Sequence, residues 1–342
     1  MSQLIELARA PRRRGASPET DGRRRLRAVQ RLVANNQWIL LLLLTVVLAV
    51  VAGSVNSRFW HPENIASIFQ DVAVLGLVAS GATILIISGN FDISVGAAMG
   101  LSSCVTAMLI INGWGELPAV LVGILVCVGC STFNGVCSII FKAPSFIISL
   151  ATLGIYTGIS LELTGGVIQN VFQNFTTLSG TIYLRVIPLI FMVTLAGYIG
   201  THLVLSYTRL GRRAYAIGDN PRAAFLAGIN VKRNIIFFFV LNGLLVGLGA
   251  WLLLARVGGA LPTTGQGMEL QAIGATVIGG VPIMGGRGSV VGTFFGVLLM
   301  GTISNILNIL NVSPYFQQMA YGGLIVAAVA ISALRVRLGA RE

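Results

Sequence analysis

Ten long stretches of mainly apolar residues dominate this chain and limit what it can fold into. A helix needs about 20 such residues to cross the hydrocarbon core of a bilayer. The predicted spans are 38–56, 65–88, 93–112, 117–141, 146–164, 183–206, 234–256, 268–284, 289–311 and 317–334. Only 10% of the 342 residues are charged, whereas soluble domains average about 25%. The sequence therefore predicts an all-α integral membrane protein with about ten transmembrane helices.

Glycines interrupt two of the predicted spans, 93–112 and 268–284. A Gly-Ala-Thr motif that begins at Gly81 recurs at Gly274, and a glycine-rich segment follows each copy. Transporters often contain inverted repeats whose matching Gly-interrupted helices lie at the pathway. The two copies lie six spans apart, however, and an inverted repeat of five spans requires an odd offset. Either the match is chance, or one predicted span is a broken or re-entrant helix.

The basic residues lie at the ends of the apolar spans. If the spans alternate and the N-terminus is inside, all of the 23 Lys and Arg except Arg58, Arg185 and Arg256 fall on the inner side. Such an asymmetry is typical of cytoplasmic connectors. We therefore expect both termini to be cytoplasmic. The expected domains are an Arg-rich disordered tail at 1–36, a transmembrane domain at 37–335 and a short tail at 336–342. The net charge of +12 then indicates contact with lipid headgroups and not with nucleic acid.

The most basic connector, 207–233, contains the signals of a short capped helix. Asp219 and Asn220 are good N-cap residues, and Pro221 suits the first helical position. Good helix formers follow, and Gly228 can end the helix. A capped helix in a cytoplasmic connector predicts a docking element for a soluble partner.

A polar break, Ser88 to Gly96, separates two apolar helices. Asp92 within it would be costly in lipid, so it should face protein or water. One interpretation is a polar segment that lines a transport pathway or its gate. The other is a tight turn at the membrane surface, in which Asp92 caps the helix that resumes at Ile93.

Three further carboxylates, Asp71, Glu162 and Glu269, lie in or beside predicted spans, toward the outer face. An ionisable group inside a span is a functional candidate by default. Water at the membrane interface is the alternative explanation for all three. They form no regular ladder, so the sequence does not indicate a proton relay.

The sequence contains no nucleotide-binding loop. A P-loop needs a lysine directly after a glycine-rich loop, and neither Lys142 nor Lys232 follows one. No nucleophile or metal-binding motif is present either. We expect a non-catalytic chain that binds no cofactor, so that a partner hydrolyses any ATP that transport requires.

Several longer motifs resemble one known family. They include Gly89-Asn-Phe-Asp-Ile-Ser-Val-Gly96, Thr152-Leu-Gly-Ile-Tyr-Thr-Gly158, the segment from Leu210 to Ala224, Gly285-Gly-Arg-Gly-Ser289 and Asn311-Val-Ser-Pro-Tyr315. Together they make the chain, from about residue 38, similar to permease subunits of bacterial ATP-binding-cassette (ABC) importers for ribose-type sugars. That group also includes permeases for arabinose, galactose, xylose and autoinducer-2.

The resemblance implies a permease in the bacterial inner membrane that works with a second permease copy, identical or related. An ABC ATPase subunit, which uses ATP and Mg, would dock on a cytoplasmic coupling helix. Carried onto this chain, that helix comprises Asp219, Asn220, Pro221, Arg222, Ala223, Ala224 and Gly228. A sugar-binding protein would deliver the substrate at the outer face, where the amide-rich loop 165–182 either contacts it or lies on the membrane as an ordinary loop.

A sugar is uncharged and rich in hydroxyl groups, so its path should offer amides, hydroxyls and aromatic faces. The expected pathway or gate residues are Asn90, Phe91, Asp92, Ser94, Gln70, Asn134 and Thr157. The alternative function is an ion-coupled secondary transporter of a small polar solute. It would need a carboxylate pathway and no soluble ATPase.

Overall fold

The computed structural model of this chain describes residues 37–313, 315–324, 326 and 330. The two predicted tails, 1–36 and 336–342, lie outside the described residues. Within the residues that the structure describes, seven helices are long and apolar enough to cross a membrane. They are α2 (Gln37–Val55), α3 (Pro62–Ile87), α5 (Glu116–Phe141), α6 (Ser145–Thr164), α8 (Leu189–Tyr207), α11 (Val231–Val257) and α13 (Val290–Ile309).

The remaining elements are short. Two apolar helices, α4 (Val95–Ile111) and α12 (Met268–Ile278), take the places of the third and eighth predicted spans. The others are η2 (Ser57–Trp60), α7 (Thr176–Gly180), α9 (Arg209–Asp219), α10 (Pro221–Leu226), β1 (Gln169–Asn170), β2 (Ile182–Tyr183), β3 (Ile187–Pro188) and β4 (Gly259–Ala260). Residues 315–324, at the start of the tenth predicted span, are also helical, and most of that span lies outside the described residues.

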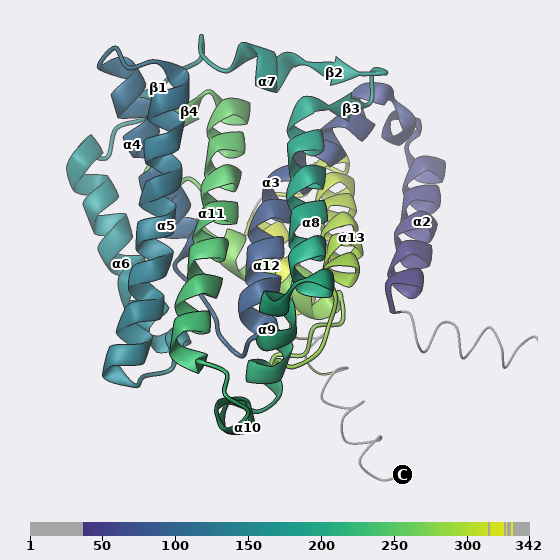
Figure 1. Cartoon of the computed structure of the whole chain (residues 1–342). Coiled ribbons are helices and arrows are strands. Elements are labelled where there is room, and N and C mark those ends of the chain that lie inside the picture. Colours follow the sequence, from purple (N-terminus) through teal and green to yellow (C-terminus); the bar gives the residue numbers. More distant parts are fainter. Residues whose placement is uncertain (1–36, 314, 325, 327–329, 331–342) are drawn as a thin grey trace, which may run out of the picture.

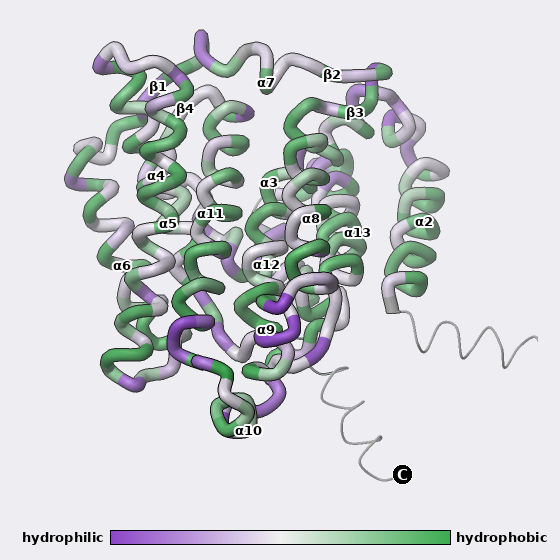
Figure 2. Tube along the Cα trace, in the orientation of Figure 1, coloured by the Kyte–Doolittle hydropathy of each residue, from purple (hydrophilic) through white to green (hydrophobic). Residues whose placement is uncertain are grey.

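The helices form one bundle around α3, which packs against α8, α11, α12 and α13 (Figure 1). Helix α10 projects from one end of the bundle, which we call the α10 end. The opposite end, the α7 end, carries α7 and the pairings of β1 with β4 and of β2 with β3. Hydropathy follows this arrangement, because apolar residues fill the long helices, whereas hydrophilic residues gather in α9 and in the connector beside α10 (Figure 2).

One predicted boundary was wrong by several residues. The sixth span was predicted to start at 183, whereas α8 begins at Leu189. The intervening residues form the β2–β3 hairpin, in which Ile182 pairs with Pro188 and Tyr183 with Ile187. An apolar hairpin of this kind resembles the start of a span when hydropathy alone is considered.

The third and eighth predicted spans are broken helices. Helix α4 extends over only about 25 Å and α12 over about 16 Å, at 1.5 Å per residue. Non-helical chain precedes each of them. The non-helical stretch before α12 lies against the first turns of α4. A Cβ atom added at Gly100 would come within 2.6 Å of the Pro262 carbonyl oxygen, and one at Gly96 within 2.5 Å of that of Gly265. The N-termini of these two short helices therefore meet inside the bundle.

This geometry bears on the repeated Gly-Ala-Thr motif. From the meeting point, α4 runs to the α7 end and α12 runs to the α10 end (Figure 1). The broken spans are the third and the eighth, so they lie five spans apart and point in opposite directions, as an inverted repeat requires. The motif copies themselves lie in α3 and α12, which are not equivalent elements of such a repeat. The positions and directions of the two broken spans therefore fit an inverted repeat, whereas the two copies of the short motif do not.

The sequence contains G-x-x-x-G spacings at Gly96/Gly100, Gly154/Gly158, Gly243/Gly247 and Gly292/Gly296, a pattern that permits close helix packing. All but the one on α6 lie where another part of the chain approaches closely. A Cβ atom at Gly296 on α13 would overlap the carbonyl oxygen of Ala275 on α12, and one at Gly243 on α11 would come within 2.6 Å of the Val128 Cα on α5. The exception is α6, where nothing lies within 4 Å of a Cβ atom at Gly154 or Gly158. Internal packing therefore explains the spacings on α11 and α13 but not the one on α6.

This contrast gives a matched pair of substitutions. We expect Gly296→Ala to lower the free energy of unfolding by about 1–3 kcal/mol, because the added methyl group meets a backbone atom that cannot move aside. Gly158→Ala should be neutral or slightly stabilising, since alanine favours a helix more than glycine does. Thermal unfolding of both variants in detergent checks this. Equal melting temperatures would contradict the close crossing of α12 and α13.

Candidate functional site

The first candidate site is the α10 end. Helix α9 ends at Asp219, and Asn220 links it to α10. The Asn220 Oδ1 atom accepts hydrogen bonds from the backbone N–H groups of Arg222 and Ala223, both at 3.0 Å, and Pro221 occupies the first turn. The capped helix predicted from the sequence is therefore present. Its cap is Asn220 alone, and the assignment of Asp219 as a second cap was wrong because Asp219 closes the preceding helix.

Two large apolar side chains at the tip of α10 face outward. Phe225 is 68% exposed and Leu226 is 80% exposed, whereas Ala224 beside them is buried. Exposed apolar residues in a hydrophilic surrounding are typical of a protein contact surface. The coupling residues expected from the sequence lie on both sides of this pair and do not include it. The missed signal was two adjacent large apolar residues inside the most basic connector of the chain.

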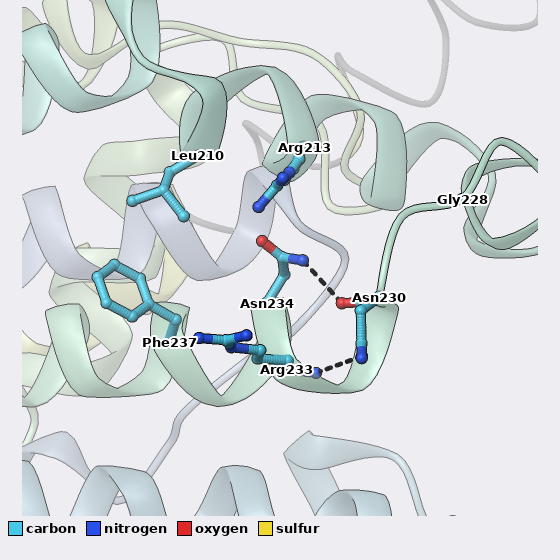
Figure 3. A pocket seen from close by; sticks show the side chains of 7 residues that line it. All are labelled: Leu210, Arg213, Gly228, Asn230, Arg233, Asn234 and Phe237. Carbon is cyan, nitrogen blue, oxygen red and sulfur yellow. Dashed lines mark hydrogen bonds between the residues drawn. The ribbon is translucent and has the colours of Figure 1, made fainter.

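A basic cavity of about 380 Å³ lies beside this tip, between α9 and α11 (Figure 3). Arg213 comes from α9 and Arg233 from the first turn of α11, and no acidic residue lines the cavity. Asn230 shapes its edge, since its Oδ1 atom accepts from the Arg233 N–H at 3.1 Å and its carbonyl oxygen accepts from Asn234 Nδ2 at 2.7 Å. The α10 end thus combines an apolar tip with a neighbouring positive cavity, which suits a partner surface that has both apolar and acidic groups.

The second candidate site is a polar cluster inside the bundle, around Asp92. The side chain is only 7% exposed. Its Oδ1 atom accepts from the Ser94 N–H at 3.0 Å, from Ser94 Oγ at 2.7 Å and from Asn134 Nδ2 at 3.1 Å. Its Oδ2 atom accepts from Ser131 Oγ at 3.0 Å and from Asn242 Nδ2 at 3.3 Å. These five donors connect the broken span to α5 and α11, and none of them is a cation.

Helix α6 completes the cluster. Asn134 Oδ1 accepts from Thr152 Oγ1 at 2.7 Å and from the Tyr156 hydroxyl at 3.2 Å. The backbone of the non-helical segment is held in the same way, because the N–H groups of Phe91 and Ile93 donate to hydroxyl groups of serines on α6. The bundle therefore supplies the hydrogen bonds that the missing helical turns would have made.

The position of Asp92 excludes one of the two interpretations of the polar break. Asn242 lies eleven residues along α11, roughly 16 Å from its start, so Asp92 lies well inside the bundle. The interpretation as a surface turn was therefore wrong. Asp92 is also not the residue that precedes α4, because that helix begins at Val95 and Ser94 occupies the capping position.

The structure brings together some of the predicted pathway residues and separates others. Asp92, Ser94 and Asn134 share the cluster, and Phe91 and Asn90 lie in the segment that leads to it. Thr157 instead donates to the Leu153 carbonyl oxygen of its own helix, and Gln70 lies half-buried on α3. These two residues are not part of the cluster, and the roles assigned to all seven stay predictions.

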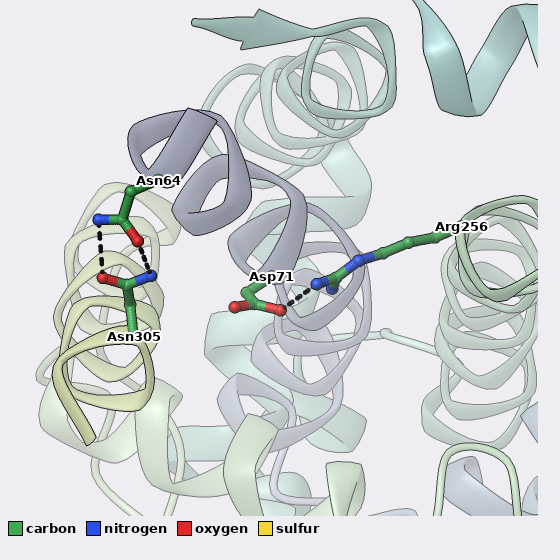
Figure 4. A network of polar contacts seen from close by, with 4 residues as sticks. All are labelled: Asn64, Asp71, Arg256 and Asn305. Carbon is green, nitrogen blue, oxygen red and sulfur yellow. Dashed lines mark hydrogen bonds and ion pairs between the residues drawn. The ribbon is translucent and has the colours of Figure 1, made fainter. Parts of the chain in front are cut away.

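The other carboxylates have different surroundings. Asp71 forms an ion pair with Arg256, at 2.6 Å between Oδ1 and a guanidinium nitrogen (Figure 4). Nearby, Asn64 and Asn305 exchange side-chain hydrogen bonds of 3.1 and 2.8 Å. Glu269 is buried and accepts from the Gly267 N–H, whereas Glu162 is exposed. The sequence analysis missed the partner of Asp71, although both residues were placed near the outer ends of their spans.

We expect Arg256→Gln to lower the free energy of unfolding by about 1–3 kcal/mol, because it leaves the Asp71 carboxylate without its counter-charge. The double variant Asp71→Asn with Arg256→Gln should regain most of this loss. Thermal unfolding of the single and double variants in detergent measures the coupling between the two side chains. Additive losses would show that the ion pair contributes nothing.

Comparisons with known proteins agree with the motifs found in the sequence. Residues 64–329 match the family described as branched-chain amino acid transport system / permease component. The chain is 36% identical over 285 residues to the ribose import permease protein of Bacillus subtilis (strain 168), which covers 83% of this chain and 88% of the relative. No solved structure matches the chain.

Two further relatives have similar names. The D-allose transport system permease protein of Escherichia coli (strain K12) is 35% identical over 295 residues, 85% of this chain and 90% of the relative. The autoinducer 2 import system permease protein of Yersinia enterocolitica is 30% identical over 306 residues, 89% of this chain and 84% of the relative. The chain is therefore a multi-pass protein of the inner membrane, and it belongs to the family of permease components described as branched-chain amino acid transport system / permease component.

Proposed function

We propose that this chain is the membrane-spanning permease subunit of an ABC importer, and that it forms the pathway for a monosaccharide or a similar small polyol. The observation that carries the proposal is its similarity, over most of its length, to permeases named for the import of ribose, allose and autoinducer 2. The chain itself is non-catalytic in this proposal. A separate ABC ATPase binds ATP and Mg, and a sugar-binding protein delivers the substrate.

The proposed orientation places the α10 end in the cytoplasm. Six Lys and Arg residues lie in the connector 207–233 at this end, together with the exposed apolar tip of α10. Positive connectors favour the cytoplasmic side. The α7 end, with the loop 165–182, then faces the binding protein, and both termini lie in the cytoplasm.

The mechanism follows from how the α10 end is attached to the bundle. The last turn of α9 is in close contact with the end of α3, and the Gly286 N–H donates to the Ile87 carbonyl oxygen at 2.9 Å. The non-helical segment of the broken span follows α3 directly. An ATPase that binds the α10 end more tightly in one conformation of the permease than in the other would shift the permease toward that conformation, by no more than that difference in affinity. A second permease copy would supply the other half of the pathway.

Transport in proteoliposomes tests this function. The chain is reconstituted with its ATPase, the binding protein is added outside, and a panel of pentoses and hexoses that includes D-ribose and D-allose is assayed. We expect uptake of at least one sugar that requires ATP and an intact ATPase. Uptake that persists without the ATPase would favour the ion-coupled alternative, and uptake of no sugar would reject the proposal.

A cysteine placed at Gln173 should react with an impermeant reagent from outside, and a reaction from the cytoplasm alone would reverse the orientation.

A further inference from the structure

A polar cavity near the α7 end lies away from the Asp92 cluster. Its volume is about 630 Å³, within the range of sites for small ligands. Three separate parts of the chain form it: the loop and first turn of α12, the later part of α13, and the helical residues 315–324. The side chains that define its chemistry are those of Thr263, Gln266, Gln271, Ser304, Gln318 and Tyr321.

Amides and hydroxyls dominate this lining, and it contains no charged residue. One glutamine of the wall, Gln317, is committed to the protein, because its Nε2 atom donates to Asn308 Oδ1 at 2.7 Å and to the Val312 carbonyl oxygen at 3.0 Å. The side-chain amides of Gln266, Gln271 and Gln318 have no hydrogen-bond partner among the described residues. The cavity therefore presents several amide groups that remain available to a ligand.

The place of Ser304 on α13 shows how deep one wall of the cavity lies. Ser304 precedes the end of α13 by five residues, roughly 8 Å along its axis. Glutamine side chains at such a depth are costly when they face hydrocarbon and are normally turned toward protein or water. The cavity is thus better suited to a hydrated solute than to a lipid chain.

An ion pair borders the cavity. The ion pair between Asp71 and Arg256 (Figure 4) lines a smaller space of about 80 Å³. This space shares Gln271, Ser304 and Tyr321 with the cavity. The two charges neutralise each other, so the site attracts neither anions nor cations as a whole. A carboxylate and a guanidinium can nevertheless accept from and donate to neutral hydroxyl groups.

We propose that this cavity binds one small, uncharged polyhydroxy solute during its passage through the protein. The amides and hydroxyls pair with the solute's hydroxyl groups, Tyr321 offers an aromatic face to its C–H side, and Gln271 and Ser304 lie between the solute and the ion pair. The assignment rests on the proposed import function. None of the seven pathway residues predicted from the sequence lines this cavity.

The test uses the complete transport complex in proteoliposomes and the sugar that the wild-type complex takes up. We expect Gln271→Leu to reduce uptake at least about tenfold, because an apolar side chain leaves solute hydroxyls without partners. Stimulation of the ATPase by the loaded binding protein should stay within about twofold, since this step precedes entry of the solute. Asn112→Leu, an amide-to-leucine change at an exposed residue outside the cavity, should keep uptake within about twofold.

A second measurement covers the case in which Gln271→Leu disturbs folding. Gln318→Cys is made in a Cys137→Ser background, because the other three native thiols are buried. The transported sugar should slow modification by an impermeant thiol reagent at least about threefold, and a sugar from the panel that is not transported should have no effect. Normal uptake by Gln271→Leu together with no protection at Gln318→Cys would overturn the site while the import function stands. Absence of uptake in the wild-type complex would instead reject the function and the site together.

Discussion

Asp92→Ala is expected to prevent accumulation of the folded protein. The change removes the acceptor of five hydrogen bonds from Ser94, Ser131, Asn134 and Asn242, which lie inside the bundle. Hydrogen bonds between membrane helices contribute about 0.6 kcal/mol each on average, and up to about 1.7 kcal/mol. Because five hydrogen bonds inside the bundle lose their acceptor at once, we expect a loss of about 3–5 kcal/mol, a large part of the total stability of most proteins.

Asp92→Asn is the matched control. It keeps the shape of the side chain and one oxygen acceptor. The other oxygen is replaced by an NH2 group, which needs a hydrogen-bond acceptor of its own. One is available, because Asn242 Oδ1 is buried without a hydrogen-bond partner among the described residues. We expect the Asn variant to accumulate at more than half the wild-type amount and the Ala variant at less than a tenth. Membrane yield and thermal unfolding measure the difference. If the Ala variant accumulates and melts like the wild type, the cluster does not hold the broken span in place.

The sequence predicted the spans well because hydrophobic length is a local property. Helices α2, α5, α6 and α13 begin and end within two residues of their predictions. The cap at Asn220 was likewise predicted, since a cap depends on the residues that directly follow it. Even the two broken spans could be recognised as weak, because glycines and polar residues interrupt them.

Contacts between distant parts of the chain could not be predicted from the sequence. Nothing local to Asp92 indicates that Asn242, on a helix far along the chain, donates to it, and nothing local to Asp71 indicates Arg256. The polar cavity has the same origin, because its glutamines lie in two segments that only the fold brings together. The predicted pathway residues were chosen by residue type near a polar break. That criterion finds the groups that stabilise the break as readily as groups that bind a solute.

The surface of α10 gives the prediction with the largest expected effect on function. Phe225→Ser together with Leu226→Ser should abolish coupling to the ATPase and leave the bundle intact, since both side chains are mainly exposed. We expect both side chains to be hot spots of the contact, which contribute about 2 kcal/mol or more each. Loss of two such contacts corresponds to a decrease in affinity of about a thousandfold. The measurements are the dissociation constant of the ATPase for the permease and ATP hydrolysis stimulated by loaded binding protein.

Two controls distinguish the loss of the apolar contact from a change in the structure of α10. Leu184→Ser alters an apolar residue of the α7 end that is 86% exposed, and it should leave ATPase affinity unchanged. Asn220→Ala removes the cap of α10 and keeps its apolar tip, so it should weaken docking only by the cost of a lost cap, about 1 kcal/mol or about fivefold. A further double variant, Asp219→Ala with Arg222→Ala, tests the polar residues chosen from the sequence. If this variant and Asn220→Ala lose all coupling while Phe225→Ser with Leu226→Ser keeps it, the polar residues carry the contact. A permease without an ATP site can respond to ATP only through a surface of this kind, and the identity of its side chains therefore determines how tightly the two subunits are coupled.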